Sequence, residues 1–407
     1  MGIYRELAGH PGVVRVLISQ LTARFPFGML SIILLLHMQL SYGDYTSAGI
    51  VLATQSIGQA ISGPLSSRLM GRWGMRPVLA TTSLLCAGLL VAIATVHLPL
   101  LVVAGIALCV GLCTPPVTPA VRTLYPKLVP SNQLSALFSL DAAAQEIIWV
   151  LGPVVAVFVS SQFGTTAGLC VAAGFMLFGG AWFILSPAVG QVVLPPSRRG
   201  FGAVLRYPTV VILTIIGFFF VASFAAIEAG IVAAFSGGDA HGSSMESGVV
   251  LALFAGGSLV GGLLFGHREM RPWSILLRIG IVLAGTLACL VSLNIWWLSI
   301  VLFIGGLGTA PTFAAISNVV SSTVKFSETA EAYGWVGTGQ LVGVATGSAL
   351  AGIAIDIADA QGAIFVSGML LVVCALCAAV SLRWIPDLKG RSVEPPPETG
   401  TLALPLN

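Results

Sequence analysis

The chain has 407 residues, of which 57% are hydrophobic and only 8% are charged, and its mean hydropathy is +0.99. These values exclude a soluble globular protein and predict an all-α polytopic membrane protein. The net charge of +3 comes from basic residues scattered through short loops. It therefore predicts no nucleic-acid partner, which would need a single basic patch.

Twelve apolar runs are long enough to cross a bilayer, because a spanning helix needs roughly 20 predominantly apolar residues. Their limits are set by charges and by turns rich in Pro, Gly and Ser. An even number of spans places both termini on the same side of the membrane. The predicted spans are 13–38, 46–69, 77–96, 99–121, 134–160, 164–186, 208–234, 246–266, 273–293, 295–320, 330–356 and 362–384.

One long polar connection divides these spans into two groups of six. It predicts an N-terminal six-helix bundle at 1–186, a cytoplasmic linker at 187–207 and a C-terminal six-helix bundle at 208–386. The tail at 387–407 is rich in Pro and Glu near its start, and we expect it to be disordered and cytoplasmic.

The two groups of spans are faint copies of each other. The stretch that begins at Gly49 returns about 199 positions later, and matched residues with a shift of about 195 continue the repeat in later spans. Equivalent spans in the same orientation predict two pseudo-symmetric bundles related by an axis along the membrane normal. The matched pairs are Gly58 with Gly257, Gly63 with Gly262, Gly111 with Gly306, Gln145 with Gln340, and Gly152 with Gly347.

The basic residues predict the orientation of the chain. If both termini are cytoplasmic, every Lys and Arg except Arg24 falls on the cytoplasmic side, as the positive-inside rule requires. The bare outer loops and short termini are typical of a bacterial protein. We therefore expect a multi-pass protein of the cell inner (plasma) membrane.

The turn after the second span carries a recognisable family pattern. Gly63-Pro64-Leu65 opens it and Arg72-Trp73-Gly74-Met75-Arg76 closes it. With six plus six spans and a basic middle loop, the whole chain resembles the major facilitator superfamily of transporters, including its drug and metabolite efflux members. The acidic position of the family pattern falls on Ser67 or Gly71, so the resemblance implies a cytoplasmic gate that is latched in another way or more weakly.

The resemblance implies a secondary active transporter that works by alternating access between its two bundles. A Gly152-Pro153 pair in the fifth span resembles part of the family's antiporter motif, but Ile148 and Ala156-Val157 depart from it. Proton-coupled efflux of a small, fairly apolar organic molecule is our first interpretation. A proton-independent facilitator, or a proton symporter for uptake of a small metabolite, is the alternative.

Four charged residues lie more than five residues from either end of a predicted span, where a charge is costly unless it is paired or faces water. Arg24 and Glu146 both fall roughly 15–18 Å from the cytoplasmic end of their helices, a shared depth at which the two could form a pair. Such a pair would couple proton movement to conformation, or would simply hold two helices together. The scarcity of charge in the spans favours the coupling role.

The other two buried charges receive different interpretations. Asp141 lies nearer the cytoplasmic end, and the resemblance implies that it joins a gate cluster with Arg72, Arg76 or Arg122, beside Gly63 and Gly74 of the signature turn. Glu228 lies near the outer surface, where a proton or substrate role and a simple contact with water remain open. Gln145 and Gln340 offer hydrogen bonds to a substrate or to neighbouring helices, and both interpretations stay open.

Enzyme and cofactor chemistry find no support in the sequence. The five histidines lie at or near loops without a nucleophile or a metal-ligand pattern, and no nucleotide-binding loop occurs. Cys374 and Cys377 have CxxC spacing but no His or acidic companion. We predict no enzyme activity, metal or cofactor, and a monomer whose partners are a small-molecule substrate, protons and the lipid bilayer.

Overall fold

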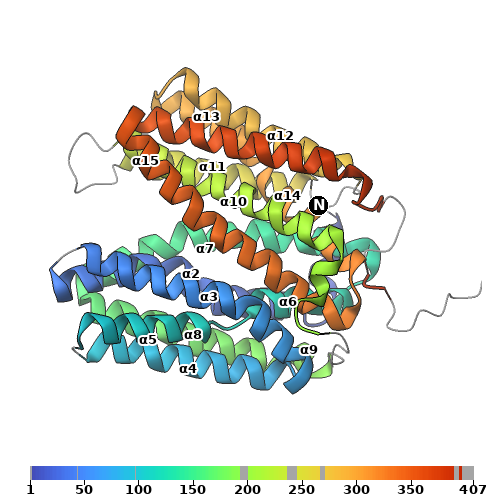
Figure 1. The fold of residues 1–407 in the computed structure, drawn as a ribbon. Coiled ribbons are helices and arrows are strands. Elements are labelled where there is room, and N and C mark those ends of the chain that lie inside the picture. Colours follow the sequence, from blue (N-terminus) through green and yellow to red (C-terminus); the bar gives the residue numbers. More distant parts are fainter. Residues whose placement is uncertain are drawn as a thin grey trace, which may run out of the picture.

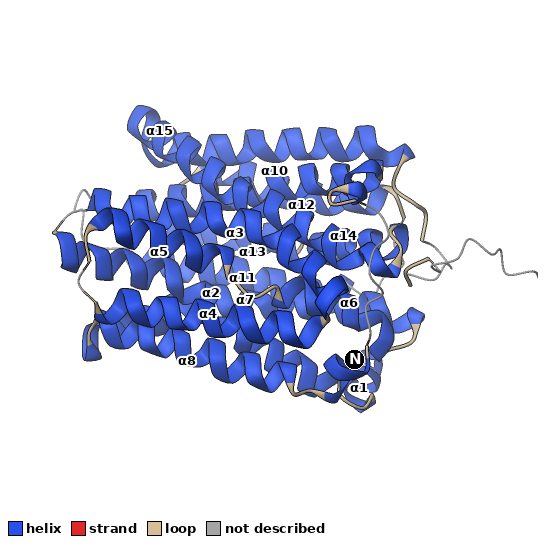
Figure 2. Cartoon of the chain, turned by 60° about the horizontal axis from the view of Figure 1, so that its bottom comes forward, coloured by secondary structure: helices blue, strands red, loops and turns tan. Residues whose placement is uncertain are grey.

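The computed structural model describes residues 2–43, 45–96, 98–192, 200–235, 245–265, 271–388 and 394–396. Every regular element in these residues is a helix, and no strand occurs among them (Figure 2). The all-α prediction is therefore confirmed. The middle of the predicted linker and most of the predicted tail lie outside the described residues.

The first half of the chain holds the predicted spans one to six. The fourth of them is divided into two helices, because Pro115 and Pro116 interrupt the backbone hydrogen bonds. The helices are α1 (Gly2–Gly9), α2 (Val13–Tyr42), α3 (Tyr45–Trp73), α4 (Met75–Thr95), α5 (Leu100–Leu112), α6 (Val117–Leu128), α7 (Ser131–Phe163) and α8 (Thr165–Ile184). Two short helices, α9 (Pro187–Gln191) and η1 (Ala203–Arg206), lie in the predicted linker.

The second half repeats this arrangement, with its fourth span again divided at the equivalent place. Its helices are α10 (Pro208–Phe235), α11 (Met245–Phe265), α12 (Trp273–Ala288), η2 (Cys289–Val291), α13 (Ile295–Gly306), α14 (Thr309–Thr323), α15 (Phe326–Val380) and η3 (Ser381–Arg383). The backbone of α15 leaves the helical conformation at Ala358 and Asp359. Its two arms on either side of this bend match the predicted spans 330–356 and 362–384.

Ten helical stretches in the described residues are long and apolar enough to cross a membrane. The whole of α15 counts as one of them, although it contains two predicted spans. The predicted span 46–69 coincides with α3, which is not among the ten. Polar residues such as Gln55, Gln59 and Ser62 recur along α3 and lower its hydropathy.

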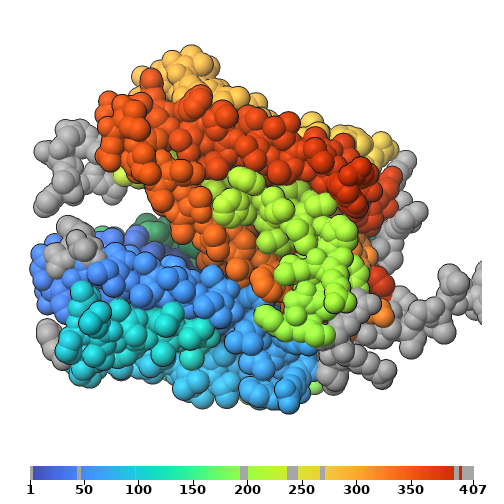
Figure 3. Space-filling model, viewed as in Figure 1, coloured from blue at the N-terminus to red at the C-terminus, as the bar shows by residue number. Residues whose placement is uncertain are grey.

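The two halves lie side by side with their helices running in the same general direction (Figure 1). We call the end of the bundle that carries the N-terminus and α9 the terminal end. Contacts between the halves join α3 to α15 and join α7 to α11 and α14. Away from the terminal end the halves separate, and the surface is hollowed between them (Figure 3).

Glycines matched by the repeat make equivalent backbone contacts in both halves. Gly58 of α3 and Gly111 of α5 bring their two helices so close that a Cβ atom on either glycine would overlap the other helix's backbone. Gly257 of α11 and Gly306 of α13 do the same in the second half. The sequence repeat therefore corresponds to a repeated packing arrangement, as small residues at membrane helix contacts allow.

We expect Gly111→Ala and Gly306→Ala each to destabilise the protein by about 1–3 kcal/mol, because the added methyl group forces two packed backbones apart. Thermal unfolding in detergent would measure the effect. Gly88→Ala is the matched control, since a Cβ atom there meets nothing within 4 Å. Equal melting temperatures for Gly111→Ala and Gly88→Ala would contradict the assigned contact.

A second pair of repeat-related contacts closes the terminal end between the halves. Gly63 of α3 touches the backbone of Gly334 in α15, with 3.1 Å between the position of a Cβ on Gly63 and the Gly334 carbonyl oxygen. Across the pseudo-symmetry axis, the Ser139 hydroxyl of α7 donates a 2.7 Å hydrogen bond to the Gly262 carbonyl of α11. Both contacts must separate if this end opens.

Candidate transport site and gate

A buried ion pair connects α2 and α7 in the first half. Arg24 Nη1 lies 3.1 Å from Asp141 Oδ1, with only 2% of the Arg24 side chain and none of the Asp141 side chain exposed. Arg122 of α6 approaches the second carboxylate oxygen, with 3.4 Å between its Nε and Asp141 Oδ2. The single carboxylate of Asp141 thus faces two guanidinium groups, and the formal charge of the three side chains together is +1.

Two amides complete the hydrogen bonding of this cluster. Gln20 accepts from Arg24 Nη1 at 2.8 Å and donates to Asp141 Oδ1 at 3.0 Å. Gln145 accepts a hydrogen bond from Arg24 Nη2. We call Gln20, Arg24, Arg122, Asp141 and Gln145 the Arg24 cluster. Its hydrogen bonds satisfy both oxygens of the Asp141 carboxylate, as a buried charge requires.

The predicted pair of Arg24 with Glu146 is wrong, because Arg24 binds Asp141 instead. Asp141 and Gln145 are four residues apart and lie on one face of α7, whereas Glu146 is turned by about 100° from Gln145. The depth estimate also placed Asp141 too near the surface, since α7 begins at Ser131 and not at 134. Depth along a helix was predicted correctly to within a turn, but the direction of each side chain was not.

Of the three arginines predicted beside Asp141, only Arg122 lies there. Arg72 and Arg76 are both exposed. Arg76 donates instead to the Ile184 carbonyl at 3.1 Å and to the Ser186 carbonyl at 3.4 Å. Gly74 links α3 to α4 with φ of 92°, a conformation that favours glycine, so its position in the signature turn has a local structural reason.

Glu146 reaches across to the other half of the molecule. The Ser258 hydroxyl of α11 donates to Glu146 Oε1 at 2.9 Å. The same hydroxyl oxygen accepts from the Ala310 amide at 3.1 Å. Ala310 lies in the first turn of α14, where backbone amides lack partners within the helix. Ser258 therefore links a carboxylate of the first half to the helix break of the second half.

Four phenyl rings of the second half lie beside this link. Phe220 and Phe224 of α10 pack with Phe313 of α14 at centroid distances of 5.4 and 6.2 Å, and Phe224 packs with Phe254 of α11 at 5.6 Å. Phe313 also packs against a cluster of small residues formed by Ala142 and Ala143 of α7 with Ala310 of α14, and the two α7 alanines lie about one turn before Glu146. Phe254 lies one turn before Ser258 on α11. We call these four rings the aromatic cluster.

The terminal end carries a cross-half ion pair that the sequence analysis missed. Arg68 Nη1 of α3 lies 3.0 Å from Glu331 Oε2 of α15, and only 4% of the Glu331 side chain is exposed. About two turns farther along α15, the Thr338 hydroxyl donates a hydrogen bond to the Ala60 carbonyl of α3 at 2.7 Å. We call Arg68 and Glu331 the latch. Glu328 and Glu331 are three residues apart, so they lie on one face of a helix. This spacing was the sequence signal that could have identified the latch.

Two predicted site residues lie away from the Arg24 cluster and from Glu146. Glu228 is exposed on α10. Gln340 lies on the first arm of α15, with 3.3 Å between its Cγ and the position of a Cβ on Gly217 of α10, and its Nε2 has no hydrogen-bond partner in the described part of the chain. Gln145 and Gln340 are thus equivalent in the repeat but differ in their contacts.

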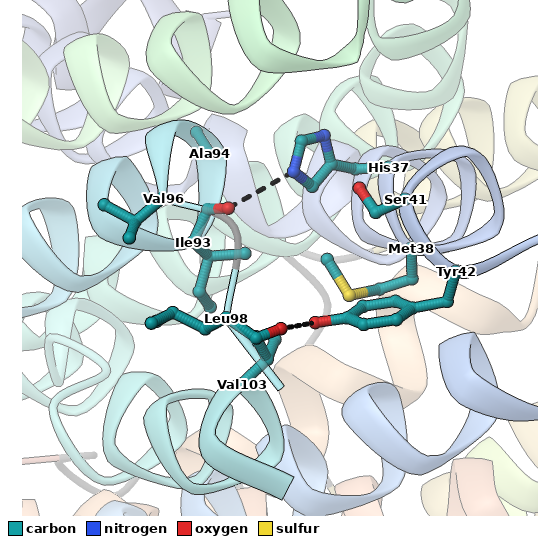
Figure 4. A pocket seen from close by; sticks show the side chains of 9 residues that line it. All are labelled: His37, Met38, Ser41, Tyr42, Ile93, Ala94, Val96, Leu98 and Val103. Atoms are coloured by element: carbon teal, nitrogen blue, oxygen red, sulfur yellow. Dashed lines mark hydrogen bonds between the residues drawn. The ribbon is translucent and has the colours of Figure 1, made fainter. Parts of the chain in front are cut away.

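A small pocket lies between α2, α4 and α5 (Figure 4). Its volume of about 20 Å³ is enough for roughly one water molecule and not for an organic substrate. His37 contacts the Thr165 hydroxyl at 2.9 Å and the Ile93 carbonyl at 3.2 Å, and Tyr42 donates to the Leu98 carbonyl at 2.7 Å. These polar side chains connect helices. No group of three metal-binding side chains occurs in the described residues.

Two pseudo-symmetric helical bundles, closed at one end and hollowed between them at the other, define a membrane transporter with a buried charged site. The chain belongs to the Major Facilitator Superfamily, whose family model matches residues 16–284 and 239–406. As a member of this family it is a transporter and not an enzyme.

The relatives agree with this assignment at low identity. Multidrug resistance protein MdtG of Klebsiella pneumoniae (strain 342) is 25% identical over 189 residues, which are 45% of each chain. The human organic anion transporter MFSD10 is 16% identical with a TM-score of 0.70, over 90% of this chain and 98% of that one. A bacterial homologue of the iron transporter ferroportin, solved in an outward-facing state, is 13% identical with a TM-score of 0.70, over 91% and 98%.

Proposed function

We propose that this protein is a secondary active transporter that exports a small, fairly apolar organic molecule in exchange for protons. The substrate binds in the hollow between the halves, and Glu146 carries the proton. One observation carries the proposal. Glu146 belongs to the first half but receives its hydrogen bond from Ser258 of the second half, so a proton on Glu146 and the separation of the halves act on the same contact.

The proposed cycle starts from the conformation described above. We place the terminal end in the cytoplasm, with the protein as a monomer in the inner membrane, so that the hollow faces outward. A proton that enters the hollow neutralises Glu146 and weakens its hydrogen bond with Ser258, because charge-assisted bonds are the stronger ones. The halves then separate at the terminal end, and cytoplasmic substrate enters as the proton leaves. Substrate and proton thus occupy the site alternately.

The surroundings of Glu146 support an apolar substrate. The aromatic cluster offers large apolar faces beside a single carboxylate, and three of its rings are partly exposed. In the Arg24 cluster, the Asp141 carboxylate is already bound by Arg24, Arg122 and Gln20. The name of the MdtG relative, a multidrug resistance protein, also agrees with export of apolar compounds.

Proton release from purified protein tests this proposal. Ethidium and the neutral dye Nile red would be added in weakly buffered detergent to the parent protein and to Glu146→Gln. We expect binding of a transported compound to release protons from the parent only. Binding without release, equal in both proteins, would overturn the proton role and leave a facilitator. Release that persists in Glu146→Gln would place the proton elsewhere.

A further inference from the structure

The end of the linker lies against the latch. The backbone amide of Gly202 donates a 2.7 Å hydrogen bond to Glu331 Oε1, while Arg68 binds the other oxygen of the same carboxylate at 3.0 Å. Each of the two oxygens of Glu331 therefore has its own partner. One partner comes from the first half of the chain and the other comes from the linker.

Phe201 adds a second contact between the linker and the latch. The Arg68 guanidinium lies over the Phe201 ring, 5.8 Å from its centroid. The Phe201 ring also contacts Trp335 of α15, with 5.9 Å between the two ring centroids. Phe201 thus contacts both halves of the molecule at the place where they meet.

The backbone of the linker is shaped for these contacts. Gly202 has φ of 78°, a left-handed conformation that glycine adopts without strain. The following turn, η1, contacts both α10 and α15 and buries the side chain of Val204, which is 1% exposed. The segment 200–206 is therefore anchored to the second half, and it holds the Gly202 amide toward Glu331.

We propose that residues 200–206 are a third component of the gate, in which Phe201 and Gly202 are positioning residues that hold Arg68 and Glu331 together. The halves can separate at the terminal end only when these linker contacts are released. The inference rests on alternating access as set out under the proposed function. It does not depend on the substrate or on proton coupling.

Distances between spin labels at the terminal end test the inference. Labels would be attached at Trp73→Cys in α3 and Trp273→Cys in α12, which are both exposed, in a full-length chain whose native cysteines are replaced. Phe201→Ala is expected to raise the ratio of open to closed molecules by about two- to fivefold, because it removes a cation–π contact at an exposed site. Phe201→Tyr should restore the parent distribution.

Two controls separate the proposed role from a general loosening of the linker. Tyr207→Phe removes the hydroxyl that donates to Glu328 at 3.0 Å, a contact that does not reach the first half, and it should leave the distances unchanged. In an Arg68→Gln background, Phe201→Ala should add no further shift. Additive shifts, or an equal shift in Tyr207→Phe, would overturn the inference. A failure of the proton-release experiment would leave it intact.

Discussion

Vesicles that contain Glu146→Gln should fail to accumulate substrate in response to a pH gradient, while the same vesicles still exchange labelled for unlabelled substrate. The amide keeps the size and the hydrogen bonding of the side chain, but it cannot bind or release a proton. In the proposed exchange, protons leave an acidic vesicle as substrate enters. Accumulation should therefore require an acidic interior, and it should fall to the level of empty vesicles in the variant.

The control for this experiment is Glu228, an exposed acid in α10. Glu228→Gln should accumulate substrate like the parent protein, because the cross-half hydrogen bond from Ser258 goes to Glu146 and not to Glu228, although Glu228 lies one turn after Phe224 on α10. Loss of accumulation in Glu228→Gln alone would move the proton site to α10. Loss of exchange as well as accumulation in Glu146→Gln would indicate that Glu146 binds substrate and does not couple it to protons.

The helices were predictable because membrane spans are long, apolar and ended by charges and turn residues. The break at Thr114–Pro116 and its counterpart near Pro311 lie at prolines that the repeat matches, so the chemistry of proline accounts for both. The repeat also identified Gly58 and Gly111 as equivalent to Gly257 and Gly306, and their packing is equivalent in the structure. The chemistry of single residues and the comparison of the two halves were therefore sufficient to predict these features from the sequence.

The partners of the charged residues were not predictable in the same way. The rise of a helix gives the depth of Arg24 and Glu146, but it does not say which face of α7 turns toward α2, and neighbouring residues on a helix differ in direction by about 100°. The Arg68–Glu331 latch joins residues 263 positions apart, on helices whose contact depends on how the two halves dock. That arrangement is a property of one conformation of the molecule, and a single sequence does not specify it.

Asp141→Asn should destabilise the protein by about 3–5 kcal/mol, because it leaves the Arg24 and Arg122 guanidiniums buried without a carboxylate. The asparagine oxygen can still accept hydrogen bonds, but it offers no negative charge to two cations. The expected result is a clear drop in melting temperature in detergent and a lower yield of folded protein. Asp356→Asn, at an exposed position in α15, should change stability by no more than about 0.5 kcal/mol.

A second substitution distinguishes charge imbalance from loss of packing. Adding Arg24→Gln to Asp141→Asn removes one of the two cations and leaves amides that can bind each other and Gln20. Stability should recover in part, so the effects of the two substitutions should be far from additive. If the double variant is instead less stable than Asp141→Asn by the full effect of Arg24→Gln alone, the two residues are not coupled. Arg24 would then stabilise the bundle through its packing, and the ion pair with Asp141 would contribute little.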